Sequence, residues 1–189
     1  IISGSVLSRR RYRRRERTEP DMNRPEIRDV TGEPLEVNLD IIRRSFQTVA
    51  DEMGITPENA PRYTAFLPLE RLREERDNGA RFFGYFIDGR QVGFVTAEPE
   101  DGGKWFMKRL AVLPEYRGRG IARKLIEKVI DYVKGRGVTC LHIGIVNEQR
   151  GLKAWYERMG FKEYEVFEIP NLPFTVALLK KDLNTENGV

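Results

Sequence analysis

At 189 residues with 40% hydrophobic side chains, the chain is long enough to bury a core of its own. One cysteine, Cys140, and one histidine, His142, exclude a disulfide framework and leave carboxylates to supply most of any metal site. No apolar run approaches the ~20 residues that a membrane-spanning helix needs. We therefore expect a cytoplasmic globular protein that binds no metal.

The net charge of +4 comes from one end of the chain. Residues 1–21 hold seven arginines, all of them in "RRRYRRRER", against three carboxylates, and the remaining residues are balanced in charge. Such a like-charge run is expected to be disordered. It is either an arm for nucleic acid or another acidic surface, or an unstructured extension ahead of an original start at Met22. We place the domain boundary there, with a single domain over residues 22–189.

The first part of this domain predicts one strand and two helices. Residues 26–30 ("EIRDV") are expected to form the strand. Apolar side chains then recur every three or four residues over 39–53, which predicts a helix with Asn38 as its N-cap and Gly54 just past its end. After a loop, "PLERLREERDNG" over 68–79 predicts a short charged helix.

Three strands are expected next. The runs "RFFGYFI" and "QVGFVTA" flank Asp88-Gly89, a pair that suits the positive φ angles of a hairpin turn. A turn, "EPEDGG" at 98–103, leads to "KWFMKRLAV", which predicts a strand over 104–112 that Pro114 ends.

Helices and strands alternate in the rest of the chain. An apolar stripe predicts a helix over 120–134, a strand is expected over 139–146, and a second helix over 148–160. The runs "FKEYEVFEI" and "FTVALLKK" are typical of a closing antiparallel pair. This order of elements predicts a mixed α/β domain with a largely antiparallel sheet and one βαβ crossover.

The segment "PEYRGRGIARKL" joins the strand over 104–112 to the helix that follows it. Backbone N–H groups at a helix start lack internal partners and carry partial positive charge, so they suit a phosphate. Gly118 and Gly120 allow a ligand to approach closely, and Arg117 and Arg119 add cationic donors. The spacing fits neither a P-loop nor a dinucleotide fingerprint. On local chemistry alone, a phosphate cradle and a solvated turn remain equally good interpretations.

The surroundings of this segment favour the phosphate cradle, because "LAVLPEYRGRGIARKLI" resembles the acetyl-CoA-binding segment of the GNAT superfamily of N-acetyltransferases. The superfamily's pattern, Arg/Gln-x-x-Gly-x-Gly/Ala, is met by Arg117, Gly120 and Ala122. Downstream, "IVNEQRGLKAWYERMGF" resembles the second half of that cofactor site, and the likeness runs from about residue 26 to 182. The resemblance implies a mostly antiparallel, splayed central sheet flanked by helices.

The resemblance also implies roles for individual residues. Backbone N–H groups of the turn would bind the pyrophosphate of coenzyme A: Arg117, Gly118, Arg119, Gly120, Ile121 and Ala122. The strand edge at Leu110, Ala111 and Val112 would pair with the pantetheine arm, provided that the neighbouring strand separates after Val112. Asn147 would hydrogen-bond the cofactor from the other wall, a role compatible with serving as a helix N-cap. Tyr156 would protonate the departing thiolate.

The implied reaction is direct attack of a neutral amine on the thioester of acetyl-CoA, with a backbone N–H near Ala111 stabilising the oxyanion. Some superfamily members carry a glutamate at the positions of Phe106 or Lys108, so the general base is open in this chain. Glu98 is the first candidate, and Glu100 and a water chain are the alternatives. Lys108 is expected to be salt-bridged, or else to favour an acidic substrate.

The acceptor is expected to be a small-molecule amine or a peptide. Its site would be bordered by loops 54–67 and 165–173, which carry the aromatic residues Tyr63, Phe66 and Phe167. Members of the superfamily often form homodimers. The competing hypothesis is a nucleic-acid- or ribosome-associated acyl-CoA-binding protein that acts through the Arg-rich segment.

Overall fold

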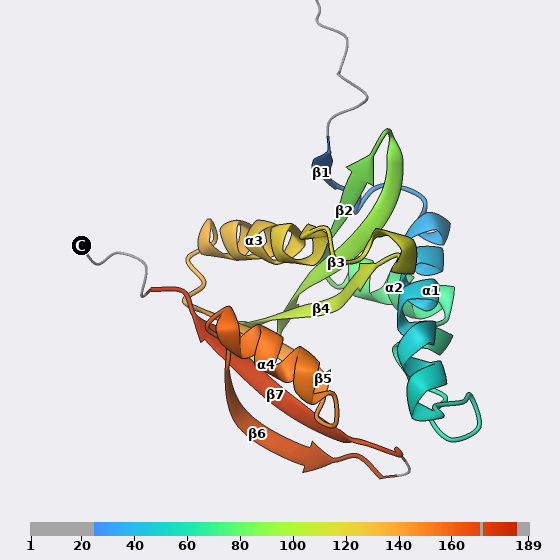
Figure 1. The fold of residues 1–189 in the computed structure, drawn as a ribbon. Coiled ribbons are helices and arrows are strands. Elements are labelled where there is room, and N and C mark those ends of the chain that lie inside the picture. The colour runs from blue at the N-terminus through green and yellow to red at the C-terminus, as the bar shows by residue number, and fades with distance from the viewer. Residues whose placement is uncertain (1–24, 171, 185–189) are drawn as a thin grey trace, which may run out of the picture.

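The computed structural model describes residues 25–170 and 172–184, and the Arg-rich segment at 1–21 lies outside them. Helices and strands follow one another along the chain (Figure 1) as β1 (Glu26–Asp29), α1 (Leu35–Met53), α2 (Leu69–Asp77), β2 (Arg81–Ile87), β3 (Arg90–Glu100), β4 (Lys104–Val112), α3 (Ile121–Lys134), β5 (Cys140–Val146), α4 (Arg150–Arg158), β6 (Lys162–Glu168) and β7 (Thr175–Asp182). Among these described elements, no helix is both long and apolar enough to cross a membrane.

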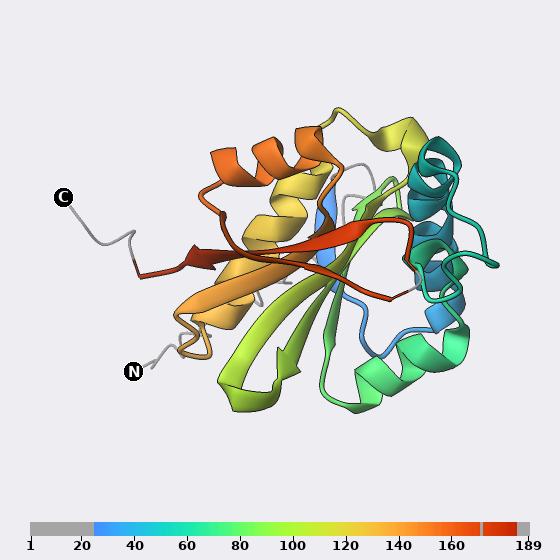
Figure 2. The same ribbon diagram turned by 90° about the horizontal axis from the view of Figure 1, so that it is seen from below.

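The strands form one seven-stranded sheet in the order β1-β2-β3-β4-β5-β7-β6. Neighbouring strands are antiparallel except β4 and β5, which run parallel because α3 carries the chain across between them. Figure 2 shows α3 and α4 on one face of the sheet, with α1 and α2 on the other. The predicted fold, a mixed and mostly antiparallel α/β sheet with one βαβ crossover, is confirmed.

The parallel pair of β4 and β5 is very short. Only Trp105 pairs with Leu141, and Phe106 with His142. Beyond these two pairs the strands diverge, so the edge of β4 from Met107 onward has no partner in β5. We had expected the separation to begin after Val112, and it begins six residues earlier in the chain. A long stretch of β4 backbone is therefore open to another partner.

Strand β4 also contains a β-bulge. Thr96 of β3 pairs with Lys108 and Phe94 with Ala111, so a single residue of β3 faces two residues of β4, Arg109 and Leu110. Arg109 adopts a φ of 55°, a left-handed conformation that is uncommon for a residue with a Cβ. Bulges bend a strand and redirect its groups, and this one lies on the open part of β4.

The first helix begins earlier than its sequence pattern predicted. It starts at Leu35, after Pro34, and Asn38 lies inside it rather than at its N-cap. Asn38 is buried, and its Oδ1 accepts a hydrogen bond of 2.8 Å from Nε2 of Gln91 in β3. The amide therefore attaches the helix to the sheet. The predicted end of the helix is confirmed, since Gly54 caps it with a φ of 63°.

The start of α3 packs closely against β3 at Gly93. A Cβ placed on Gly93 would lie 3.1 Å from Cδ1 of Leu125 and 3.2 Å from Cγ2 of Ile121. A glycine at this position lets the first turns of α3 rest directly on the sheet. This contact fixes where the N-terminus of α3 points, beside the open edge of β4.

Candidate active site

A cleft of about 1400 Å³ opens where β4 and β5 separate. It lies between α1 and the following loop on one side, and β5, α4 and the connection from β6 to β7 on the other. Eight of the predicted site residues line it: Leu110, Val112, Arg117, Gly118, Gly120, Ile121, Ala122 and Tyr156. Four do not: Glu98, Ala111, Arg119 and Asn147.

The glycine turn and the first turn of α3 form one end of the cleft. Gly118 and Gly120 have φ angles of 76° and 74°, and a Cβ built on either would meet no atom within 4 Å. The space above both glycines is therefore open to a ligand. No side chain of the described residues caps α3, so its first backbone N–H groups face the cleft without an intrahelical partner. This arrangement can hold an anion such as a pyrophosphate.

The two arginines of the turn are engaged by the protein. Nη2 of Arg117 donates to the backbone oxygen of Ser45 at 2.8 Å and to Oγ1 of Thr48 at 3.0 Å, both in α1. Nη2 of Arg119 donates to the backbone oxygen of Glu115 at 3.3 Å. The sequence of the turn alone suggested that both guanidinium groups bind the phosphate. Their contacts instead attach the turn to α1 and to itself, which leaves the backbone N–H groups as the main donors.

The open edge of β4 presents Val112 to the cleft and turns Ala111 away from it. The N–H of Leu113 donates to the backbone oxygen of Val92 at 2.9 Å, and backbone groups alternate in direction along a strand. Ala111 therefore points its N–H toward β3, and Val112 points its own toward the cleft. Nε of Arg117 reaches the Val112 oxygen at 3.3 Å from that side. The oxyanion donor expected near Ala111 is thus better placed at Val112, or at Leu110 in the bulge.

Tyr156 of α4 lies in the cleft wall and is only 5% exposed. Its ring meets those of Trp155 and Phe161 edge-on, with centroids 5.0 and 5.5 Å away. Burial raises the pKa of the Tyr156 phenol well above its ordinary value of 10, because the phenolate would be poorly solvated there. The hydroxyl therefore stays protonated at neutral pH and can serve as a proton donor.

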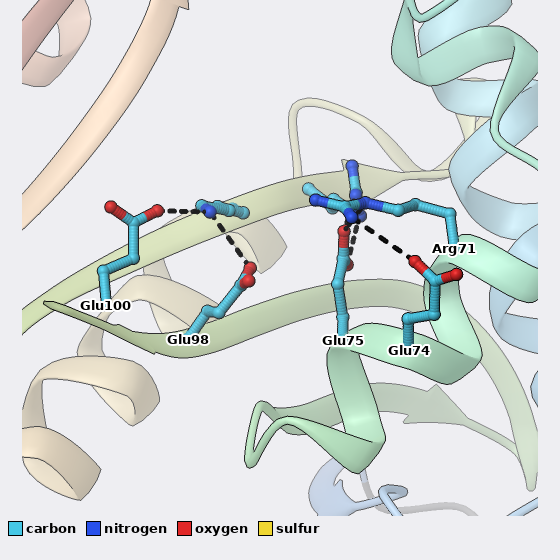
Figure 3. Close-up of polar contacts among 7 residues, drawn as sticks. Arg71, Glu74, Glu75, Glu98 and Glu100 are labelled. Atoms are coloured by element: carbon cyan, nitrogen blue, oxygen red, sulfur yellow. Dashed lines mark hydrogen bonds and ion pairs between the residues drawn. The ribbon is translucent and has the colours of Figure 1, made fainter.

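Lys108 lies between two carboxylates of β3. Its Nζ is 3.1 Å from Oε2 of Glu98 and 2.6 Å from Oε1 of Glu100, and these two glutamates are seen together in Figure 3. The salt bridge predicted for Lys108 is confirmed. Glu98 is largely buried, with 13% of its side chain exposed, and it stands behind Lys108 rather than in the lining itself.

A second ion pair holds the bulge of β4. Nε of Arg109 donates to Oε2 of Glu75 in α2 at 2.9 Å, and Nη2 of Arg109 contacts Oε1 of the same carboxylate. Arg71 approaches Glu75 from the solvent side, with Nε 3.3 Å from Oε1 (Figure 3). Glu75 is 3% exposed, so this bidentate pair is shielded from water. The ion pair connects Arg109, the left-handed residue of the bulge, to helix α2.

Asn147 serves the protein framework. Its Nδ2 donates to Oγ1 of Thr175 at 3.1 Å, and its Oδ1 accepts from Nζ of Lys153 at 3.3 Å. The N-cap position of α4 is Gln149, so the N-cap alternative for Asn147 is wrong. Asn147 lies outside the cleft lining, and its two hydrogen bonds connect β7 and α4 beside the cleft.

His142 and Cys140 show no sign of a catalytic role. Nδ1 of His142 lies 3.2 Å from the Tyr164 hydroxyl, and its ring stacks on Phe106 with centroids 5.1 Å apart. Burial lowers the pKa of His142, and Lys104 and Lys180 lower it further. Burial raises the pKa of the Cys140 thiol, which therefore stays protonated.

Both loops that are expected to border the acceptor reach the cleft, but the sequence did not indicate all of the lining residues there. Tyr63 and Phe167 line the cleft as expected, whereas Phe66 packs behind Tyr63. Phe46, Arg62 and Phe174 also line it. The helical spacing of Phe46 suggested only a core position, and no local motif marks the other two.

The buried carboxylate of Glu75 yields a stability prediction. Glu75→Gln should lower the free energy of unfolding by about 3 kcal/mol, because it leaves the Arg109 guanidinium largely buried without its counter-charge. Urea denaturation measures the change. Glu74→Gln is the matched control: its carboxylate is 61% exposed, and its loss should cost less than about 0.5 kcal/mol. Equal midpoints for Glu75→Gln and the parent would contradict the role given to this pair.

Comparisons with known proteins bear on this cleft. The family model "Acetyltransferase (GNAT) family" matches residues 42–161. A probable N-acetyltransferase named camello, from Xenopus tropicalis, is 34% identical over 126 residues, which are 63% of this chain and 57% of that protein. The L-2,4-diaminobutyric acid acetyltransferase of Nocardia farcinica is 44% identical over 61 residues, 31% of this chain and 32% of that protein. The chain thus spans well under two thirds of these curated relatives.

Solved structures share the fold. The paiA N-acetyltransferase of Thermoplasma acidophilum, solved in complex with coenzyme A, superposes with a TM-score of 0.68 at 21% identity over 84% of this chain and 99% of that one. A GNAT family acetyltransferase from Elizabethkingia anophelis, solved with acetyl-CoA bound, gives 0.60 at 17% identity over 84% and 97%. The family match extends from α1 through α4 and includes the glycine turn, the bulged strand and Tyr156. The chain therefore belongs to the GNAT family of acetyltransferases, which take their acetyl group from acetyl-CoA.

Proposed function

We propose that the protein transfers the acetyl group of acetyl-CoA to the primary amine of a small acceptor, by direct attack within a ternary complex. The observation that carries the proposal is the position of the uncapped start of α3 beside the unpaired edge of β4. Family membership supports the choice of donor. The Nocardia farcinica relative is named for a small amino acid, which supports a small molecule as the acceptor.

Coenzyme A would be held mainly by backbone groups. The pyrophosphate fits the N–H groups over Gly118 to Ala122, where both glycines leave space and the helix dipole favours an anion. The pantetheine arm carries amides that can pair with the open edge of β4 at Val112, as an added strand would. The fit is good because this edge would otherwise leave polar backbone groups without a protein partner.

The bound thioester supplies an acetyl group whose carbonyl carbon accepts the amine nitrogen, so that an N–C bond forms and the C–S bond breaks. The N–H of Val112 or Leu110 would donate to the carbonyl oxygen as negative charge develops there. Tyr156 would donate its proton to the leaving sulfur. The amine must lose a proton, and Glu98 would collect it through water, since its carboxylate shares a sheet face with Phe106, which lines the cleft.

The donor site can be tested without knowing the acceptor. The parent should bind coenzyme A in isothermal titration calorimetry, and Gly120→Glu should weaken binding about 100-fold or more. The variant places a carboxylate against the pyrophosphate and a Cβ on a residue with a φ of 74°. Arg119→Ala is the matched control in the same turn and should change the affinity less than about fivefold, because that side chain is outside the cleft lining. A parent that does not bind coenzyme A would falsify the proposal.

Tyr156→Phe separates proton donation from binding. Turnover should fall about 100-fold, while the affinity for coenzyme A should stay within about twofold of the parent, because the ring and its packing are kept. Steady-state kinetics and calorimetry on the same preparation measure the two quantities. Unchanged turnover would remove the acid role from Tyr156.

Glu98→Gln tests the proposed base. Turnover should drop about 100-fold at neutral pH. Glu100→Gln is the matched control, because Glu100 contacts the same Lys108 ammonium from the next outward-facing position of β3. It should keep the parental turnover. If the two variants behave alike, the effect belongs to the charge around Lys108 rather than to a base.

A further inference from the structure

The end of the cleft away from α3 has apolar walls. One wall comes from α1 and the loop after it, and includes Phe46 and Tyr63. The facing wall comes from the end of β6, the connection that follows it and β7, and includes Phe167, Phe174 and Leu178. An acceptor that fills this space needs a sizeable apolar group, since apolar lining contributes most of the binding energy in such sites.

Aromatic contacts join these walls into one structure. The Tyr63 ring meets Phe46 edge-on at 6.2 Å and Phe174 at 5.8 Å between centroids. Tyr63 and Phe174 are both buried, at 9% and 8% exposure, in a cluster of their own beside the main core. The walls are thus preformed in the protein, and an apolar ligand would not need to order them first.

The charges at this end of the cleft do not balance. Lys108 is neutralised by Glu98 and Glu100, and Arg109 by Glu75. Within the described ranges 25–170 and 172–184, no aspartate or glutamate lines the cleft, and Arg62 has no ionic partner. Arg62, an exposed residue of the lining, is therefore available to an anionic group of the acceptor.

Nearby carboxylates do not change this balance. Glu165 of β6 lies opposite Leu178 and shares its sheet face, yet it is exposed and outside the lining. A polyamine or a lysine side chain would bring a second cation into a cleft that offers it no carboxylate, at a cost in desolvation. A carboxylate on the acceptor would meet Arg62, whose planar fork binds carboxylates bidentately.

We propose that the acceptor is a free α-amino acid with a large apolar side chain, whose carboxylate is bound by Arg62 and whose side chain fills the space around Tyr63 and Phe174. This assignment rests on the acetyl transfer proposed above and names its acceptor class. The α-amine of such a molecule lies two bonds from its carboxylate carbon, so anchoring the carboxylate also restricts where the reacting nitrogen can be.

The test compares four acceptors with the full chain, by the release of free thiol from acetyl-CoA: L-phenylalanine, phenethylamine, spermidine and a peptide with an N-terminal phenylalanine. Phenethylamine keeps the ring and the amine but lacks the carboxylate. The kcat/KM for phenylalanine should exceed that for phenethylamine about 10- to 100-fold, the value of one hydrogen-bonded charge contact. Spermidine and the peptide should stay near background. Preference for spermidine, for the peptide, or equally for phenethylamine overturns the proposal.

Arg62→Gln should remove the difference between phenylalanine and phenethylamine by raising the KM for phenylalanine about 10-fold or more. Arg73→Gln is the matched control, an exposed arginine of α2 outside the cleft, and should keep the parental preference. Calorimetric titration of phenylalanine into the protein–coenzyme A complex gives a readout that does not depend on turnover. If coenzyme A binds and phenylalanine does not, this assignment falls while the acetyl-CoA site stands. If coenzyme A does not bind, both fall.

Discussion

The early separation of β4 from β5 is the constraint on which the rest of the structure depends. Two parallel strands that continued side by side would satisfy each other's backbone groups and leave no room between them. Here the pairing ends after Phe106 and His142, so the following part of β4 carries polar groups that need another partner. The cleft and the place of Tyr156 in its wall follow from that opening.

In the function proposed above, the bulge at Arg109 and the glycine turn adapt this opening to coenzyme A. The bulge redirects the backbone of β4 where the thioester would lie, and Glu75 keeps its left-handed residue in place from below the sheet. The turn brings uncapped N–H groups to the same cleft, and Gly93 allows α3 to rest against β3 so that they point there. Backbone geometry, rather than charged side chains, therefore defines the donor end, and Arg117 contributes by attaching the turn to α1.

The acceptor end is built differently, from side chains of distant segments. Tyr63 follows α1 and Phe174 precedes β7, and they meet only because the sheet brings β7 opposite α1. The charges of Lys108 and Arg109 are cancelled by neighbours on other elements, and in our proposal Arg62 is the cation that meets the carboxylate of the acceptor. Selectivity for the acceptor can therefore change through single side chains while the donor site, which depends on backbone geometry, remains the same.

By itself the sequence determined the order of helices and strands, the strand Lys104–Val112 residue for residue, and the nature of the glycine turn, because these depend on local periodicity and φ preferences. Family resemblance singled out Tyr156 as a proton donor, and the structure places this residue in the cleft wall, while its role stays a prediction. Only the tertiary structure decided the rest. The sequence pattern places Asn38 at a helix cap, whereas its partner Gln91 lies 53 residues away in the chain. The hydrogen bond of Asn147 to Thr175, 28 residues away, likewise has no signal in the local sequence. The ion pair of Arg109 with Glu75 and the position of Arg62 in the cleft lining also depend on the tertiary structure. Contacts between segments that are distant in the chain leave no pattern in the local sequence.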